Sequence, residues 1–82
     1  MIKVGDKVRI LENVAVDRDN ITVIRLHKFA IGSIVKVIHV YDQNELSAIG
    51  KDENSDDTVE QYLMNTKNLK QFEKVTDMKV EE

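Results

Sequence analysis

The segment HKFAIGSIVKVIHVYD, residues 27–42, carries the strongest strand signal of this 82-residue chain. Residues 34–41 are rich in β-branched side chains, and Gly32-Ser33 marks a turn before them. The apolar positions 34, 35, 37, 38 and 40 fit neither phase of a two-residue repeat. We therefore expect a central strand that is either covered on both faces or bent by a β-bulge, as closure of a small barrel requires.

Weaker strand signals lie on either side of this segment. Residues 7–11 alternate apolar and charged side chains, which is typical of a half-buried strand. Residues 46–49 follow a polar hairpin turn at 42–45, and an acidic loop extends from there to residue 57. These patterns predict a mainly β fold.

The stretch 12–28 contains two short alternating runs, around Val14 and Val16 and around Ile21 and Val23. The polar tetrapeptide DRDN separates them. The pattern predicts a long irregular hairpin or an excursion loop.

Two structures compete for residues 58–75. A helix is possible because Asp57 can act as an N-cap, and it would give an α+β fold. Alternatively, residues 58–64 form a strand, a turn follows, and residues 69–75 form the last strand. Asn65, Thr66 and Asn68 disfavour a helix interior, so local physics leans slightly toward strands.

Length and composition predict one domain, residues 1–75, followed by a flexible tail, residues 76–82. The chain has only four aromatic residues and no Trp, so its core must be mainly aliphatic. A core of this size supplies no more than about 3–5 kcal/mol of net stability. No apolar stretch approaches a signal peptide or a membrane span, so we expect a soluble, cytoplasmic protein.

No pattern indicates an enzyme, a metal site or a cofactor. The absence of cysteine excludes thiol catalysis, thiolate zinc sites and disulfides. Ser33 lacks the context of a nucleophile elbow, and His39 lies within the central strand, where a surface role is expected. The acidic stretch from Asp52 fails the spacing of a calcium-binding loop, because Asp57 and Leu63 stand where Gly and Glu are required.

The net charge of −3 opposes binding to a polyphosphate at long range. The alternative is a local basic patch, with Tyr41 stacking on a base. Its members would be Arg18, Arg25, His27, Lys28, Lys36 and His39. These residues are better explained as ordinary solvent-exposed polar side chains of strands and loops.

The order of three segments resembles a known group of proteins. These are VGDKVRIL at 4–11, HKFAIGSIVKVIHVYD at 27–42 and VEQYLMNTKNL at 59–69. Together they resemble small SH3-like β-barrel proteins encoded by phages and prophages of Gram-positive bacteria. The resemblance covers roughly residues 4–72. It implies about five strands, a single 3-10 turn at 65–69 before the last strand, and strands rather than a helix near the C-terminus.

The functional prediction is a non-enzymatic binding module, an accessory protein of a phage or prophage in a bacterial cytoplasm, that contacts another protein. The expected partner-binding residues are Arg25, His27, Lys28, Tyr41 and Tyr62. A groove for proline-rich peptides is not expected, because it needs more aromatic residues than this chain has. The alternatives are a nucleic-acid-binding small barrel of KOW or Tudor type and a self-associating structural protein.

Overall fold

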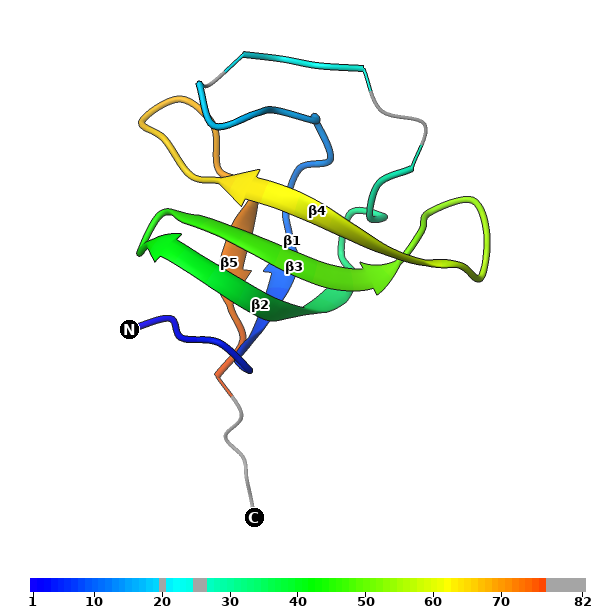
Figure 1. The fold of residues 1–82 in the computed structure, drawn as a ribbon, viewed down its shortest axis with the longest axis horizontal. Coiled ribbons are helices and arrows are strands. Elements are labelled where there is room, and N and C mark those ends of the chain that lie inside the picture. Colours follow the sequence, from blue (N-terminus) through cyan, green and yellow to red (C-terminus); the bar gives the residue numbers. More distant parts are fainter. Residues whose placement is uncertain (20, 25–26, 77–82) are drawn as a thin grey trace.

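The computed structural model describes residues 1–19, 21–24 and 27–76. Its strands are β1 (Lys7–Ile10), β2 (Ile34–Asp42), β3 (Glu45–Lys51), β4 (Thr58–Met64) and β5 (Phe72–Lys74). They form one antiparallel sheet in the order β4-β3-β2-β1-β5 (Figure 1). The described residues contain no helix, so the mainly β prediction is confirmed and the helical alternative for 58–75 is wrong. None of them forms a helix that could cross a membrane.

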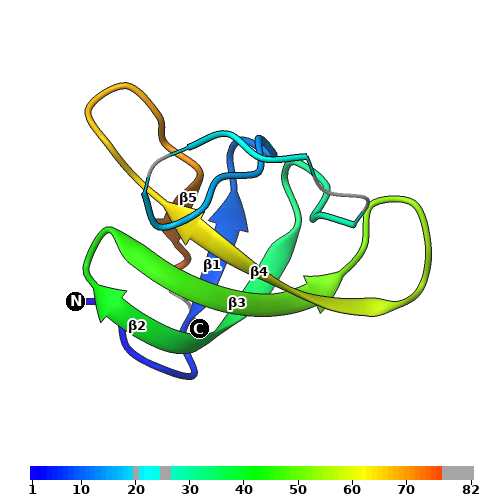
Figure 2. The ribbon, with the colours of Figure 1, turned by 45° about the horizontal axis from the view of Figure 1, so that its top comes forward.

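The central strand β2 is bent by a β-bulge, which is one of the two expectations from its broken alternation. Val37 pairs with Ala48 and His39 with Ser47, so Ile38 is an extra residue on β2, and a second register shift lies between Val40 and Asp42. The bulge shifts the phase of the strand and lets β2 and β3 curve together (Figure 2). Ile34, at the start of the strand, is 44% exposed, so the first change of phase lies at Ile38.

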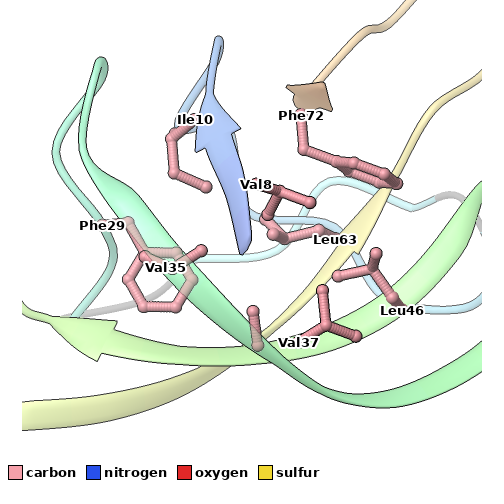
Figure 3. Packing of buried hydrophobic residues seen from close by; sticks show 9 residues of the cluster. Val8, Ile10, Phe29, Val35, Val37, Leu46, Leu63 and Phe72 are labelled. Atoms are coloured by element: carbon pink, nitrogen blue, oxygen red, sulfur yellow. The ribbon is translucent and has the colours of Figure 1, made fainter. Parts of the chain in front are cut away.

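The hydrophobic core fills the concave side of the sheet, and each strand except β5 contributes aliphatic side chains to it (Figure 3). Its fully or nearly fully buried members are Val8, Ile10, Phe29, Val35, Val37, Leu46, Ala48, Leu63 and Phe72. The core is mainly aliphatic, as the composition predicts. Phe29 comes from the segment before β2 and closes one end of the core.

The edge strands β4 and β5 do not pair, so the sheet remains open. Two amide side chains join them where β4 ends. Oε1 of the fully buried Gln71 accepts the Met64 N–H at 3.0 Å, and the Gln71 Nε2 donates to the Val14 carbonyl. Nδ2 of Asn65 donates to the Phe72 carbonyl at 2.9 Å.

The turn before β5 differs from the 3-10 turn that the resemblance implies. Residues 65–70 form a loop closed by an isolated bridge between Asn65 and Lys70. The Asn65 Oδ1 accepts the N–H groups of Gln71 and Phe72, and the Thr66 Oγ1 accepts that of Leu69. Because side chains satisfy these backbone donors, no 3-10 turn forms, and β5 begins at Phe72 instead of residue 69.

The loop between β1 and β2 folds back over the convex face of the sheet, where it passes β4 (Figure 2). It forms an irregular hairpin, with Val16 bridging Thr22 and the Val23 N–H donating to the Ala15 carbonyl. This confirms the hairpin interpretation of residues 12–28 for its described part. Val16 packs with Tyr62, Met64 and the partly buried Leu69 in a second, smaller apolar cluster.

Candidate functional site

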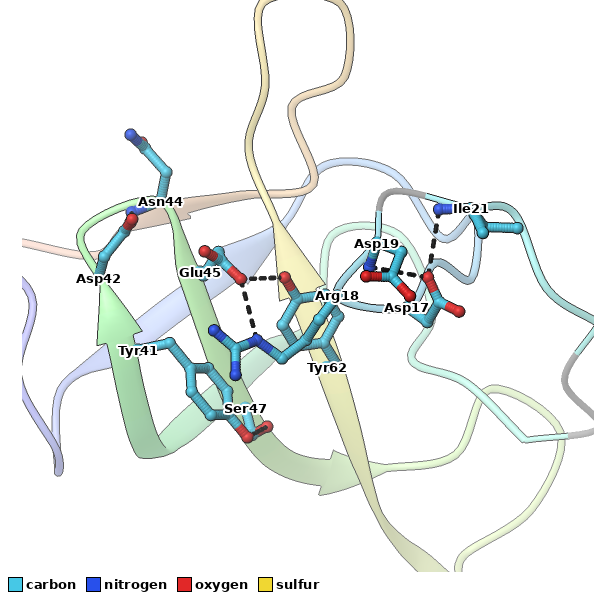
Figure 4. Close-up of polar contacts among 10 residues, drawn as sticks. All are labelled: Asp17, Arg18, Asp19, Ile21, Tyr41, Asp42, Asn44, Glu45, Ser47 and Tyr62. Atoms are coloured by element: carbon cyan, nitrogen blue, oxygen red, sulfur yellow. Dashed lines mark hydrogen bonds and ion pairs between the residues drawn. The ribbon is translucent and has the colours of Figure 1, made fainter.

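The convex face of the sheet carries a cluster of polar and aromatic side chains beside the β1–β2 loop (Figure 4). Cross-strand register creates it, because His39 of β2 lies opposite Ser47 of β3, and Ser47 lies opposite Tyr62 of β4. Residues directly opposite in a sheet project from the same face. We name this group the Tyr41 cluster; it comprises Arg18, His39, Tyr41, Glu45, Ser47 and Tyr62.

Tyr41 is 40% exposed, yet its ring is contacted from several sides. The His39 ring centroid lies 4.3 Å away and that of Tyr62 lies 5.9 Å away, both in tilted geometry. The Tyr41 Oη is 3.4 Å from the Ser47 Oγ. The guanidinium carbon of Arg18 lies 4.2 Å from the Tyr41 centroid, in a cation–π arrangement. These contacts hold the ring in place while part of it faces solvent.

Glu45 connects the loop to the sheet through one carboxylate oxygen (Figure 4). Its Oε2 lies 3.2 Å from the Arg18 Nε and accepts a 2.5 Å hydrogen bond from the Tyr62 hydroxyl. Burial and the hydrogen bond to Glu45 raise the pKa of Tyr62 well above its ordinary value, so the phenol stays protonated and remains a donor. The hydrogen bond to Glu45 likewise raises the pKa of Arg18.

The surroundings of Arg18 carry more acidic than basic groups. Asp17 and Asp19 flank it in the loop, and Asp42 follows Tyr41 at the β2–β3 turn (Figure 4). The Asp17 carboxylate accepts two backbone N–H groups, and the Asp42 carboxylate accepts one at 2.6 Å, so both are fixed turn residues. Of these carboxylates, Glu45 is the one that pairs with Arg18.

A second polar group lies beyond the other end of β3, around the nearly fully buried Asp52. Its carboxylate accepts the Lys28 N–H at 3.0 Å and the Ser55 hydroxyl at 3.1 Å, and lies 3.4 Å from the His27 Nδ1. Burial by itself would raise the pKa of Asp52. The hydrogen bonds from His27, Lys28 and Ser55 outweigh it and lower the pKa. This group anchors the end of the β1–β2 loop to the β3–β4 loop.

The structure places the predicted partner-binding residues that it describes at two separate sites. Tyr41 and Tyr62 are brought together, whereas His27 and Lys28 lie at the Asp52 group, at the opposite end of β3. Arg25 lies outside the described residues. The Tyr62 hydroxyl donates to the Glu45 carboxylate.

Sequence reasoning grouped Arg18 with Tyr41 and His39 only in the basic-patch alternative, and it did not pair Arg18 with Glu45. They are far apart in the chain and follow no motif, and they meet only because the loop folds onto the sheet. Among the described residues, no three His, Cys, Asp or Glu side chains are placed to hold a metal ion. Comparison with protein-family models, curated proteins and solved structures finds no match.

Proposed function

We propose that this protein is a small protein-binding module whose contact surface is the Tyr41 cluster. The observation that carries this proposal is that Tyr41 is exposed and yet held by Arg18, His39 and Tyr62. Tyr and Arg are enriched among the residues that dominate protein interfaces. A ring that is already ordered loses little conformational entropy on binding.

The charges near Tyr41 favour a protein partner over a nucleic acid. Phosphate groups would approach Asp17, Asp42 and Glu45, while the guanidinium of Arg18 is already paired with Glu45 and covers Tyr41. A base would have to displace that guanidinium to stack there. The resemblance to phage and prophage proteins supports an accessory role in a bacterial cytoplasm, and that role is part of the proposal.

Affinity capture from a lysate of the source organism tests this function. We expect Tyr41→Ala to capture at least about tenfold less of the partner protein than wild type does, as substitution of an interface hot spot would. Ile31→Ala is the matched control, because Ile31 is 59% exposed in the turn before β2, away from the cluster. Equal capture by all three proteins contradicts the proposal. Capture that nuclease treatment abolishes would instead indicate nucleic acid.

A further inference from the structure

Arg18 occupies a site that has the chemistry of an arginine receptor. Its guanidinium carbon lies 4.2 Å from the centroid of the Tyr41 ring, and its Nε lies 3.2 Å from the Glu45 carboxylate. An aromatic face combined with a carboxylate is the environment in which a guanidinium is both stacked and hydrogen-bonded. Arg18 belongs to the β1–β2 loop, whereas the receptor side chains belong to the sheet.

The receptor is held by contacts that do not involve Arg18. The Tyr62 hydroxyl donates to Glu45, and Tyr62 is only 8% exposed. Tyr41 is held by His39, Tyr62 and Ser47. The loop that carries Arg18 is also held by a contact that does not involve Arg18, because Val16 packs against Tyr62 and Met64 in the second apolar cluster. Removal of the Arg18 guanidinium would therefore leave both the receptor and the loop in place.

The contact that Arg18 makes is suited to exchange. Its side chain is 59% exposed, and ion pairs in contact with solvent are screened and weak. Glu45 is only 22% exposed and is already desolvated in part, so its carboxylate gains from keeping a cationic partner.

We propose that Tyr41, Glu45 and Tyr62 form a guanidinium-binding site, which Arg18 fills in the free protein and an arginine of the partner protein fills in the complex. This inference rests on the proposed function and names the group that the surface recognises. Arg18 then acts as an internal competitor. A site that is free only about one tenth of the time binds an external ligand about tenfold more weakly than the open site does.

Short peptides test the site directly. The probes are acetyl-Gly-Arg-Gly-amide and its Lys counterpart, titrated into wild type, Arg18→Ala and Arg18→Gln and followed by NMR of the tyrosine rings. Tyr41 and Tyr62 are the only tyrosines in the chain, so their signals report on the site alone. We expect both Arg18 variants to bind the Arg peptide about tenfold more tightly than wild type, and the Lys peptide less tightly than the Arg peptide.

Two further variants separate the site from general charge effects. Arg9→Gln removes the same charge from an exposed pair with Glu73 on β1 and β5, and is expected to bind as wild type does. The double variant Arg18→Gln/Glu45→Gln is expected to bind the Arg peptide no more tightly than wild type does. The inference is overturned if neither Arg18 variant binds more tightly than wild type, if Arg9→Gln gains equally, or if the double variant keeps the gain.

Failure of this inference differs in its results from failure of the proposed function. If Tyr41→Ala loses the captured protein but the Arg18 variants bind the peptide no better, the protein-binding role stands and the guanidinium site is wrong. If the Arg18 variants gain but capture does not depend on Tyr41, the site binds guanidinium and the proposed protein-binding surface is wrong.

Discussion

At the scale of single residues, Gly50 decides how closely β3 approaches the core. A Cβ atom at this position would overlap the Val35 side chain and lie 3.3 Å from the Phe29 ring. We expect Gly50→Ala to lower the free energy of unfolding by about 1–3 kcal/mol, because overpacking forces neighbouring side chains to move. Urea denaturation followed by circular dichroism measures this change.

The cause can be isolated with a double-mutant cycle. Val35→Ala removes the methyl groups that the new Cβ would meet, so Gly50→Ala should cost much less in that background than in wild type. Simple additivity of the two changes would show that the clash with Val35 is not the cause.

Gln71 and Gln43 offer the same chemistry at different burial. Gln71 is fully buried and bonds the Met64 N–H and the Val14 carbonyl, whereas the exposed Gln43 bonds the N–H and carbonyl of Ile2. We expect Gln71→Met to cost about 2 kcal/mol or more, because buried groups lose their partners. Gln43→Met should cost less than about 1 kcal/mol, since water replaces the amide. Equal losses in urea unfolding would contradict this account of Gln71.

At the scale of elements, the Asp52 carboxylate joins the segment before β2 to the loop after β3 and makes that junction sensitive to acid. Its hydrogen bonds from Lys28, His27 and Ser55 lower its pKa below the ordinary value of 3.8. The unfolded chain therefore binds this proton more readily than the folded chain does. The stabilisation is present above about pH 4 and is lost as the pH falls through the folded pKa.

We accordingly expect the stability of wild type to fall more steeply than that of Asp52→Asn as the pH drops below about 4. Urea midpoints measured at several pH values check this difference. Asp56→Asn is the control from the same loop, because Asp56 is 99% exposed and pairs only with the exposed Lys51 in the described structure. The urea midpoint of Asp56→Asn should fall with decreasing pH as steeply as that of wild type. If the midpoint of Asp52→Asn falls as steeply as well, Asp52 is not the cause.

The elements that sequence analysis predicts well are those with local signals. β4 has the predicted bounds, 58–64, because polar loops punctuate it at both ends. The start of β5 depends on Asn65 and Gln71, whose side chains bond to distant backbone groups that no local pattern marks. The exposed position of Tyr41 is consistent with its predicted role at a surface. Its pairing with Arg18 depends on how the loop packs through Val16, which periodicity does not specify.

At the scale of the whole molecule, one apolar cluster stabilises the sheet and a second holds the β1–β2 loop. The larger cluster, on the concave side, holds the five strands together. The smaller cluster, on the convex side, holds the β1–β2 loop through Val16 against Tyr62 and Met64. Because Tyr62 belongs both to this cluster and to the Tyr41 cluster, the same side chain fixes the loop and positions Glu45. The binding surface thus rests on the sheet while its loop residue, Arg18, can change partner.

The order of strands also predicts how the chain folds. The first strand pairs with the last, Val8 with Lys74, so the five-stranded sheet is complete only after the two ends of the chain have come together. Such topologies fold in milliseconds to seconds. The chain contains no proline, so the slow phase of tens of seconds caused by proline isomerisation should be absent. Stopped-flow refolding from urea, followed by tyrosine fluorescence, should show one phase with full amplitude. That amplitude should not depend on how long the chain was kept unfolded. A slow phase that grows with this delay would show that a barrier to refolding other than proline isomerisation exists.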